Sequence, residues 1–280
     1  MKKIKGLITA LITPFQKGAV DYASLEKLVE HQLQNGVEGF VINGTTAESP
    51  TLTKEERKKI FQFIKDRVPK DFPLIFGTGS NSTAQSIEDS KEAEKMGADA
   101  LLLVVPYYNK PPQRGMLEHF KAIASAVHIP SFLYNVPGRT IAALELETIK
   151  KLSEHPQIIG IKEASGNIEF ARQIRQSCGK EFILLSGDDG TFDDFMKVGG
   201  DGVISVASHI IPQEMKKQKA TANKELIDLL FVEANPMPVK MALYLMKIIT
   251  SPECRLPLVT LSEANTEKLK KSMQGKGLLK

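Results

Sequence analysis

The sequence predicts an α/β protein, a closed (β/α)8 TIM barrel with a C-terminal helical extension. Eight short apolar, β-branched runs recur along the first three quarters of the chain, and stretches with helical apolar spacing lie between them. Such alternation is typical of parallel βαβ units, and eight units in 280 residues fit a barrel. The alternative, an open doubly wound sheet, normally has a glycine-rich turn after its first strand, where this chain has Thr13-Pro14-Phe15.

The expected strands are short runs rich in branched apolar residues, which favour β-structure. In chain order they are Leu7–Ile12, Gly39–Ile42, Leu74–Phe76, Ala100–Val105, Ser131–Tyr134, Ile158–Ile161, Phe182–Leu185 and Val203–Val206. The helix-like stretches between them are Tyr22–Gln34, Lys54–Arg67, Ala84–Met96, Met116–Ala126, Glu145–Leu152, Ile168–Cys178 and Thr191–Val198. In the first of these, Leu25, Leu28, Val29 and Leu33 fall on one face, as in an amphipathic helix.

The strand pattern stops beyond Ser208. Helical stretches around Glu225–Phe231, Val239–Ile249 and Ser262–Met273 predict an extension that packs on the barrel. Because no linker or low-complexity segment intervenes, we expect a barrel over residues 1–208 and a C-terminal helical extension over residues 209–280.

Composition indicates a soluble globular protein, with 42% apolar and 25% charged residues. The net charge of +4 is spread along the chain, so no nucleic-acid partner is expected. The first residues imitate a signal peptide, but Pro14 ends the short apolar run and no cleavage site follows. No segment is long enough to span a membrane. Two cysteines, Cys178 and Cys254, provide no disulfide framework and suit a cytoplasmic location.

Chemically unusual residues follow the strands, and in a barrel the carboxyl ends of the strands form the active-site face. These stretches are Asn43–Ser49, Gly77–Asn81, Pro106–Asn109, Tyr134–Thr140, Lys162 and Gly187–Asp189. They would bring a lysine, tyrosines, paired threonines and an arginine to one mouth.

Each residue type also has an ordinary structural interpretation. A lysine at a strand end is usually solvated, and tyrosines there pack with a wet hydroxyl. The Thr45-Thr46 pair could cap a helix, and Asp188 with Asp189 could cap the helix at Thr191. The five histidines are scattered without paired ligand spacing, so no metal site is expected.

The joint placement has a chemical meaning. A lysine in an apolar barrel interior loses hydration, so we expect its pKa to fall and a neutral amine to become available. A neutral amine condenses with a ketone to form a Schiff base, and a nearby phenol can move the protons that this requires. Threonine hydroxyls and backbone N–H groups suit one carboxylate, and Arg139 suits a second. The set fits a 2-oxo acid that is activated as an enamine.

Four motifs carry a specific resemblance, in order and with matching separations from about Gly6 to the C-terminus. They are Gly44-Thr45-Thr46-Ala47-Glu48-Ser49, Pro106-Tyr107-Tyr108-Asn109, Tyr134-Asn135-Val136-Pro137-Gly138-Arg139-Thr140 and Gly160-Ile161-Lys162-Glu163-Ala164. The chain resembles the 4-hydroxy-tetrahydrodipicolinate synthases (dihydrodipicolinate synthases) of the Schiff-base-forming pyruvate aldolase and N-acetylneuraminate lyase family. Within this wider family, the motif in which Tyr134 is followed by Val136-Pro137-Gly138-Arg139 favours the synthases.

The resemblance implies a mechanism and its residues. Lys162 carries pyruvate as an imine, Tyr134 exchanges protons there, and Thr45 links Tyr134 to Tyr108 through hydroxyls. The implied substrate-binding residues are Thr46 for the pyruvate carboxylate, Arg139 for L-aspartate 4-semialdehyde, and Gly187 with Ile204 lining the pocket. No cofactor is implied beyond the covalent Schiff base. The family also implies a homodimer in which Tyr108 enters the neighbouring active site; a homotetramer is left open.

Two departures from the family pattern stand out. Ala47 occupies a position that is usually glycine, and at positive φ an alanine would cost on the order of 1 kcal/mol. The stretch between Val206 and Phe231 is also shorter than usual, and the motif Phe231-Val232-Glu233-Ala234-Asn235-Pro236 resumes the resemblance. We expect any consequence to concern packing and assembly more than chemistry.

Lysine-inhibited members of the family bind the end product in a cleft at the dimer interface. The matching positions are Ser49, Pro50, Lys54, Arg57, Asn81, Gln85 and Tyr107. Gln85 replaces the usual glutamate, and Lys54 and Arg57 replace histidines. A like charge about 4 Å away costs roughly 4 kcal/mol at an effective dielectric of 20 and about 1 kcal/mol in water. We expect weak or absent lysine inhibition, although Lys54 and Arg57 could instead be solvated helix residues that point away.

Three other functions compete. The first is an aldolase or lyase of the same family that releases pyruvate from a sugar acid, either N-acetylneuraminate or a 2-keto-3-deoxy acid. The second is a non-catalytic barrel that binds a keto acid. The third, a phosphate-binding barrel, lacks the expected glycine-rich anion turns after strands seven and eight.

Overall fold

The computed structural model describes residues 2 and 4–279. Among them, the barrel strands are β1 (Gly6–Ala10), β4 (Gly39–Ile42), β5 (Leu74–Gly77), β6 (Ala100–Val104), β7 (Ser131–Asn135), β8 (Ile158–Glu163), β9 (Ile183–Ser186) and β10 (Gly202–Ser205). They close into a barrel in the order β1-β10-β9-β8-β7-β6-β5-β4. The predicted (β/α)8 barrel is confirmed, and the open doubly wound sheet is wrong because the strand order closes on itself.

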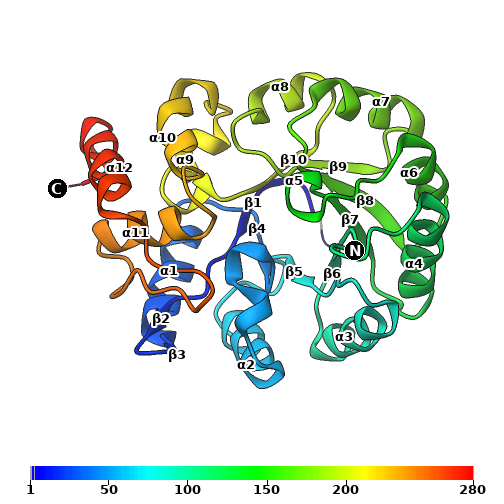
Figure 1. Ribbon diagram of the computed structural model, residues 1–280, viewed down its shortest axis with the longest axis horizontal. Helices are drawn as coiled ribbons and strands as arrows, with labels where there is room; N and C mark the ends of the chain where they lie inside the picture. The colour runs from blue at the N-terminus through cyan, green and yellow to red at the C-terminus, as the bar shows by residue number, and fades with distance from the viewer. Residues whose placement is uncertain (1, 3, 280) are drawn as a thin grey trace. The chain divides into compact units, whose positions relative to one another are not determined.

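Helices follow the strands as the periodicity predicts (Figure 1). Apart from one single-turn helix described below, the helices that lie between β1 and β10 in the chain are α1 (Tyr22–Gln34), α2 (Lys54–Lys65), α3 (Thr83–Met96), α4 (Gln113–Ser125), α6 (Leu146–Ser153), α7 (Ile168–Cys178) and α8 (Phe192–Lys197). The later ones are α10 (Lys224–Leu229), α11 (Met237–Leu245) and α12 (Glu263–Gly275), together with the short α9 (Pro212–Lys216), which the periodicity did not predict. No helix in the described part of the chain is both long enough and apolar enough to cross a bilayer.

Local capping chemistry explains where several helices begin. Asp21, Thr53, Ser82 and Asn167 each accept a hydrogen bond from a backbone N–H in the first turn of the helix that follows. These side chains satisfy donors that the helix itself leaves without a partner. Helix α3 is capped at its C-terminus by Gly97, whose φ of 81° is the left-handed conformation that glycine adopts at low cost.

Besides α9, a hairpin and a single-turn helix were not anticipated. The strands β2 (Phe15–Gln16) and β3 (Ala19–Val20) form a hairpin whose turn residues Lys17 and Gly18 both have positive φ. A two-residue turn of this kind matches the right-handed twist of a hairpin, so Lys17-Gly18 was the available signal. The other element is the single-turn helix α5 (Pro137–Thr140), which begins at a proline, a favoured first helical residue.

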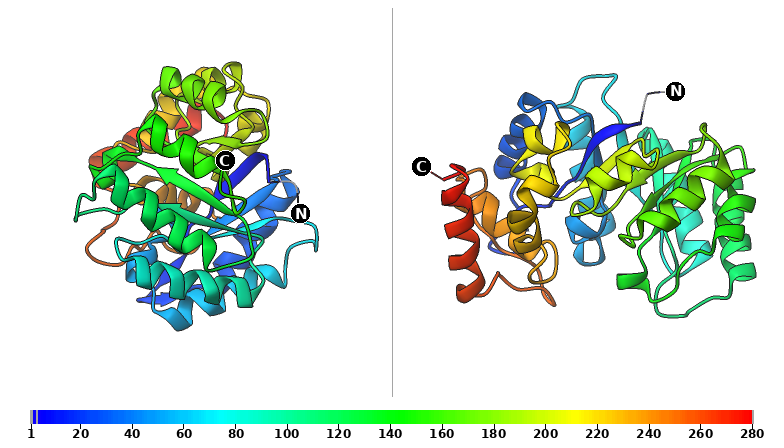
Figure 2. Two further views of the ribbon diagram at one scale, coloured as in Figure 1. Left: turned by 90° about the vertical axis from the view of Figure 1, so that its right-hand side faces the viewer. Right: turned by 90° about the horizontal axis from the view of Figure 1, so that it is seen from above.

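The chain divides into two compact units, each with its own packing. One unit contains Pro73–Ile204 and the start of the chain. In it, β5 to β9 pair in parallel, and α3, α4, α6, α7 and α8 pack in succession (Figure 2). The other unit contains Leu7–Phe72 and the chain from Ser205 onward. In it, β1 pairs with β4, and α12 packs against α10 and α11. The predicted division at residue 208 stays a prediction.

The segment expected to be shortened contains four small elements. These are a 3-10 turn at Ala207–His209, the five-residue α9, a 3-10 turn at Thr221–Asn223 and the six-residue α10. Helical structure between β10 and the Phe231–Pro236 motif therefore consists of short elements, and the shortening relative to the family stays a prediction.

Strand register places the central site residues. Along β7 and β8, Tyr134 pairs with Lys162, and Lys162 in turn pairs with Leu185 of β9. The close approach of these strands requires Gly160, where a Cβ would lie 2.3 Å from the Ile183 carbonyl oxygen. The apolar run alone placed Lys162 at the end of its strand. In the structure, β8 extends one residue further, to Glu163, so Lys162 lies inside the strand.

Candidate active site

Lys162 is a buried lysine, only 7% exposed, and the solvated-rim interpretation is therefore wrong. Its Nζ lies 4.3 Å from the centroid of the Tyr134 ring on the neighbouring strand. The ammonium forms no ion pair with any residue that the structure describes. A buried cation without an anionic partner is costly for folding, and such a group is a candidate for chemistry.

The space around Lys162 depends on Gly187, which follows β9. A Cβ at this position would lie 2.7 Å from Lys162 Cε and 2.5 Å from the Ala164 Cβ. Real Cβ atoms essentially never approach other carbons so closely. The Gly187 N–H also donates to the Glu163 carbonyl at 2.7 Å, which fixes the loop against β8. The structure therefore brings Lys162, Tyr134 and Gly187 together.

A hydrogen-bonded bridge behind these residues was not foreseen. The Asn135 amide donates to the Glu163 carboxylate at 2.7 Å, and its Oδ1 accepts from the Leu144 N–H at 2.9 Å. The Ser165 N–H donates to the other Glu163 oxygen at 2.6 Å. Burial raises the pKa of Glu163, although these donors oppose the change. The bridge joins the strand of Lys162 to the end of the loop that carries Arg139. Its sequence signal was a polar residue directly after each of Tyr134 and Lys162.

Three other predicted residues of this unit differ in exposure. Ile204 is buried at 1% in β10. Arg139 is exposed on α5, and its side chain has no hydrogen bond or ion pair with the described residues. Tyr108 is 90% exposed and has a φ of 72°, so its backbone conformation is one that L-residues rarely adopt. The ring of Tyr108 is thus presented to solvent by this single chain.

In the second unit, Thr45 and Thr46 belong to a 3-10 helix, Thr45–Ala47. The N-cap residue of this 3-10 helix is Gly44, and no side chain donates or accepts a capping hydrogen bond there. Neither threonine therefore caps a helix, and the capping interpretation is wrong. Thr45 is half-buried. Thr46 is 4% exposed, and its Oγ1 accepts a hydrogen bond of 2.9 Å from the Asn235 amide.

The positive φ considered for Ala47 is adopted instead by the next residue, Glu48. The left-handed conformation, with φ 56° and ψ 40°, is adopted by Glu48, and Ala47 is an ordinary 3-10 residue. The Ala47 carbonyl accepts from the Thr13 hydroxyl at 2.9 Å. Replacing the family's glycine by alanine at position 47 therefore costs no positive-φ strain.

Glu48 forms a fully buried ion pair with Lys240 of α11, which sequence analysis missed. The second Glu48 oxygen accepts from the Arg255 N–H at 2.9 Å, and the Lys240 ammonium also donates to the Glu253 carbonyl at 2.8 Å. Burial lowers the pKa of Lys240, and the carboxylate of Glu48 opposes that change. A buried pair of this kind is destabilising if one partner is removed, because the other charge stays uncompensated.

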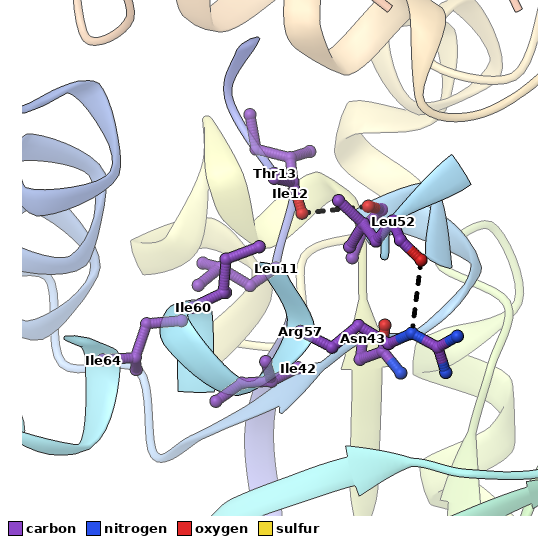
Figure 3. Close-up of a pocket in the computed structure, with 10 residues that line it drawn as sticks. Leu11, Ile12, Thr13, Ile42, Asn43, Leu52, Arg57, Ile60 and Ile64 are labelled. Atoms are coloured by element: carbon purple, nitrogen blue, oxygen red, sulfur yellow. Dashed lines mark hydrogen bonds between the residues drawn. The ribbon is translucent and has the colours of Figure 1, made fainter. Parts of the chain in front are cut away.

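A small cavity lies beneath this turn (Figure 3). Its volume of about 10 Å³ has room for about one water, so it is too small for a keto acid. Arg57 borders it and donates from Nε to the Leu52 carbonyl at 3.4 Å (Figure 3). The lining residues are Leu11, Ile12, Thr13, Ile42, Asn43, Ala47, Leu52, Arg57, Ile60 and Ile64.

Of the two acidic residues after β9, Asp188 has a structural role. The Asp188 carboxylate accepts from the Thr191 N–H at 3.0 Å and from its hydroxyl at 2.6 Å, which supports the turn into α8. No group of three or more His, Cys, Asp or Glu side chains that could hold a metal occurs within the described residues.

Comparisons with known proteins agree on one family. Residues 3–276 match the sequence model of the Dihydrodipicolinate synthetase family. A 4-hydroxy-tetrahydrodipicolinate synthase of Bdellovibrio bacteriovorus is 56% identical over 293 aligned residues, which cover 100% of both chains. The crystal structure of dihydrodipicolinate synthase from Thermotoga maritima matches with a TM-score of 0.95 and 38% identity, and covers 98% of this chain and 99% of its own.

A further solved structure that matches this chain contains pyruvate. The chloride-inhibited dihydrodipicolinate synthase from Acinetobacter baumannii, complexed with pyruvate, matches with a TM-score of 0.95 and 41% identity. The match covers 99% of the present chain and 100% of that one.

Proposed function

The chain belongs to the dihydrodipicolinate synthetase family, and on that premise we propose that it condenses pyruvate with L-aspartate 4-semialdehyde to give 4-hydroxy-tetrahydrodipicolinate. The reaction is a lyase-type condensation of lysine and diaminopimelate biosynthesis. Relatives that are named for this activity match over their full length, whereas the sugar-acid aldolase alternative is not favoured. The observation that carries the proposal is the buried Lys162, with its amine against the Tyr134 ring.

The first half of the reaction takes place on Lys162. Its neutral amine attacks the pyruvate ketone to give a carbinolamine, which loses water to form an imine. Loss of a proton from the methyl group converts the imine to an enamine. Tyr134 gives and takes the protons of these steps, because its side chain lies beside the amine. No cofactor is required, since the protonated imine accepts the electron pair of the C–H bond that breaks at the methyl group.

The second half joins the two substrates. The enamine carbon attacks the aldehyde carbon of the semialdehyde, and the aldehyde oxygen takes up a proton. The amino group of the condensed substrate then attacks the imine carbon, closes the ring and displaces Lys162. In this sequence every bond to Lys162 that forms is later broken, so the amine is regenerated.

Each substrate carboxylate has a proposed ligand. The Thr46 hydroxyl and neighbouring N–H groups hold the carboxylate of pyruvate, and Gly187 and Ile204 line the space around it. The exposed guanidinium of Arg139, which no described carboxylate neutralises, positions the semialdehyde. A guanidinium suits this role because it binds carboxylates bidentately.

Assembly is part of the proposal. We propose a homodimer, in which Tyr108 from one subunit completes the hydroxyl relay from Tyr134 through Thr45 in the other. A tyrosine that is 90% exposed in the single chain supports this, because aromatic rings are enriched where subunits meet. A homotetramer, formed by two such dimers, is the alternative assembly. The two free cysteines, Cys178 and Cys254, support a cytoplasmic location.

Borohydride trapping tests the chemistry. With pyruvate and borohydride, the reduced adduct should form on Lys162 and inactivate the enzyme, and Lys162→Ala should lose the adduct and nearly all turnover. Lys197→Ala is the matched control, because Lys197 is an exposed lysine paired with Asp194. Persistent labelling of Lys162→Ala would overturn the mechanism. Assays with N-acetylneuraminate test the aldolase alternative.

A further inference from the structure

The Phe231–Pro236 motif and the first turn of α11 contact the turn that bears Thr46. The two segments are far apart in sequence: 189 residues separate Asn235 from Thr46, and 192 separate Lys240 from Glu48. The Asn235 amide donates to Thr46 Oγ1 at 2.9 Å, and Lys240 pairs with Glu48. The proposed chemistry gives this motif no role.

The direction of the contact from Asn235 to Thr46 decides what Thr46 can bind. A threonine hydroxyl has one proton to donate, and its lone pairs accept. Because an amide nitrogen is only a donor, Asn235 occupies a lone pair of Thr46 and leaves the proton available. That proton has no acceptor among the described residues. A carboxylate only accepts hydrogen bonds, so it requires this orientation of Thr46.

We infer that Asn235 is a positioning residue that holds the Thr46 hydroxyl as a donor toward the pyruvate carboxylate. The inference rests on the proposed function, which assigns that carboxylate to Thr46. Asn235 does not itself touch the substrate in this scheme. It acts through Thr46, and its expected signature is a change in pyruvate affinity rather than in the chemical step.

The burial of Asn235 argues against a purely structural role. The residue is 6% exposed, and its Oδ1 has no hydrogen-bond partner within the described residues. An unpaired buried acceptor destabilises the fold, and an apolar residue of similar size would avoid that cost. The amide is thus unfavourable for stability at the position where it orients Thr46.

The ion pair fixes the other end of the same turn. Glu48 adopts the left-handed conformation that ends the 3-10 helix, and Lys240 holds its side chain. The N–H of Lys240 donates to the Pro236 carbonyl at 3.0 Å, so Lys240 lies in the first turn of α11, directly after the segment that carries Asn235. Both contacts come from residues after the segment that was expected to be shortened, so neither depends on a residue between Val206 and Phe231.

A double-mutant cycle tests the inference. Asn235→Ala should raise the KM for pyruvate about 10-fold, the effect of losing one hydrogen bond to a charged group, with the KM for the semialdehyde unchanged. In a Thr46→Val background, Asn235→Ala should raise the pyruvate KM no further, because the residue acts through that hydroxyl. Asn235→Asp, which keeps the size but presents acceptors to Thr46, should raise it more than Asn235→Ala does.

Asn223→Ala is the matched control, because Asn223 is equally buried and its amide donates to the Lys219 carbonyl, away from the turn. It should alter stability but not the pyruvate KM. Additive effects in the cycle, or a pyruvate KM unchanged by both Asn235 variants, would overturn the inference. If borohydride trapping on Lys162 succeeds in the wild-type enzyme while the cycle is additive, only the role of Asn235 fails. If trapping itself fails, the proposed function fails.

Discussion

Replacing Gly187 with alanine should displace the proposed nucleophile. The new Cβ would lie 2.7 Å from Lys162 Cε and 2.5 Å from Ala164 Cβ. Carbon atoms in contact normally lie about 3.5–4.0 Å apart, so Lys162 would have to move by roughly 1 Å. Overpacking of this kind costs about 1–3 kcal/mol of stability. A displacement of roughly 1 Å at a reacting group lowers the rate on the order of 10²-fold.

The measurements separate stability from chemistry. Urea unfolding gives the free energy of unfolding, and steady-state kinetics with borohydride trapping give turnover and the rate of imine formation. Gly190→Ala is the control, because a Cβ there would meet only Asp188 Oδ2 at an ordinary 3.7 Å. The double variant Gly187→Ala with Ala164→Gly removes the shorter contact but keeps the one with Lys162. It should therefore recover stability and not activity.

The result that would refute this reasoning is a Gly187→Ala enzyme with wild-type turnover and wild-type trapping rate. In that case the space at position 187 does not control the placement of Lys162. Recovery of full activity by Ala164→Gly would also contradict it, because the loss would then come from the loop alone.

Three further predictions concern assembly, regulation and pH. Tyr108→Phe should lower turnover but leave imine formation measurable, and a fully active, dilution-stable monomer in sedimentation would contradict the shared site. Lysine should inhibit weakly or not at all, and half-inhibition at submillimolar lysine would be the contrary result. Gln85→Glu with Lys54→His should increase sensitivity; the Gln85 amide now donates to Asp89 at 2.8 Å. Burial lowers the pKa of His209 to about 4. Since the unfolded chain binds this proton near pH 6.5, stability should be retained above that pH. It should fall between pH 6.5 and 4, by up to about 3 kcal/mol for this residue. Urea unfolding across that range measures the loss, and a flat profile would contradict it.

Much of the fold follows from short-range patterns in the sequence. Strand runs and helix periodicity depend on residues only a few positions apart, so the eight barrel strands and the seven helices between them were predicted almost to their bounds. Lys162, Tyr134 and the threonine pair could be selected for the same reason. Each follows an apolar run, and the parallel arrangement makes the ends of such runs the active-site face.

Tertiary structure alone decided which polar groups meet. The bond from Asn235 to Thr46 and the ion pair of Glu48 with Lys240 join segments almost two hundred residues apart, and no local pattern encodes such contacts. The positive φ at Glu48 likewise depends on how the turn is anchored, so the departure from the family pattern pointed to the neighbouring alanine instead. Side-chain direction, burial and the space beside Gly187 exist only after the strands have packed, because each is a property of neighbours that the chain brings together on folding.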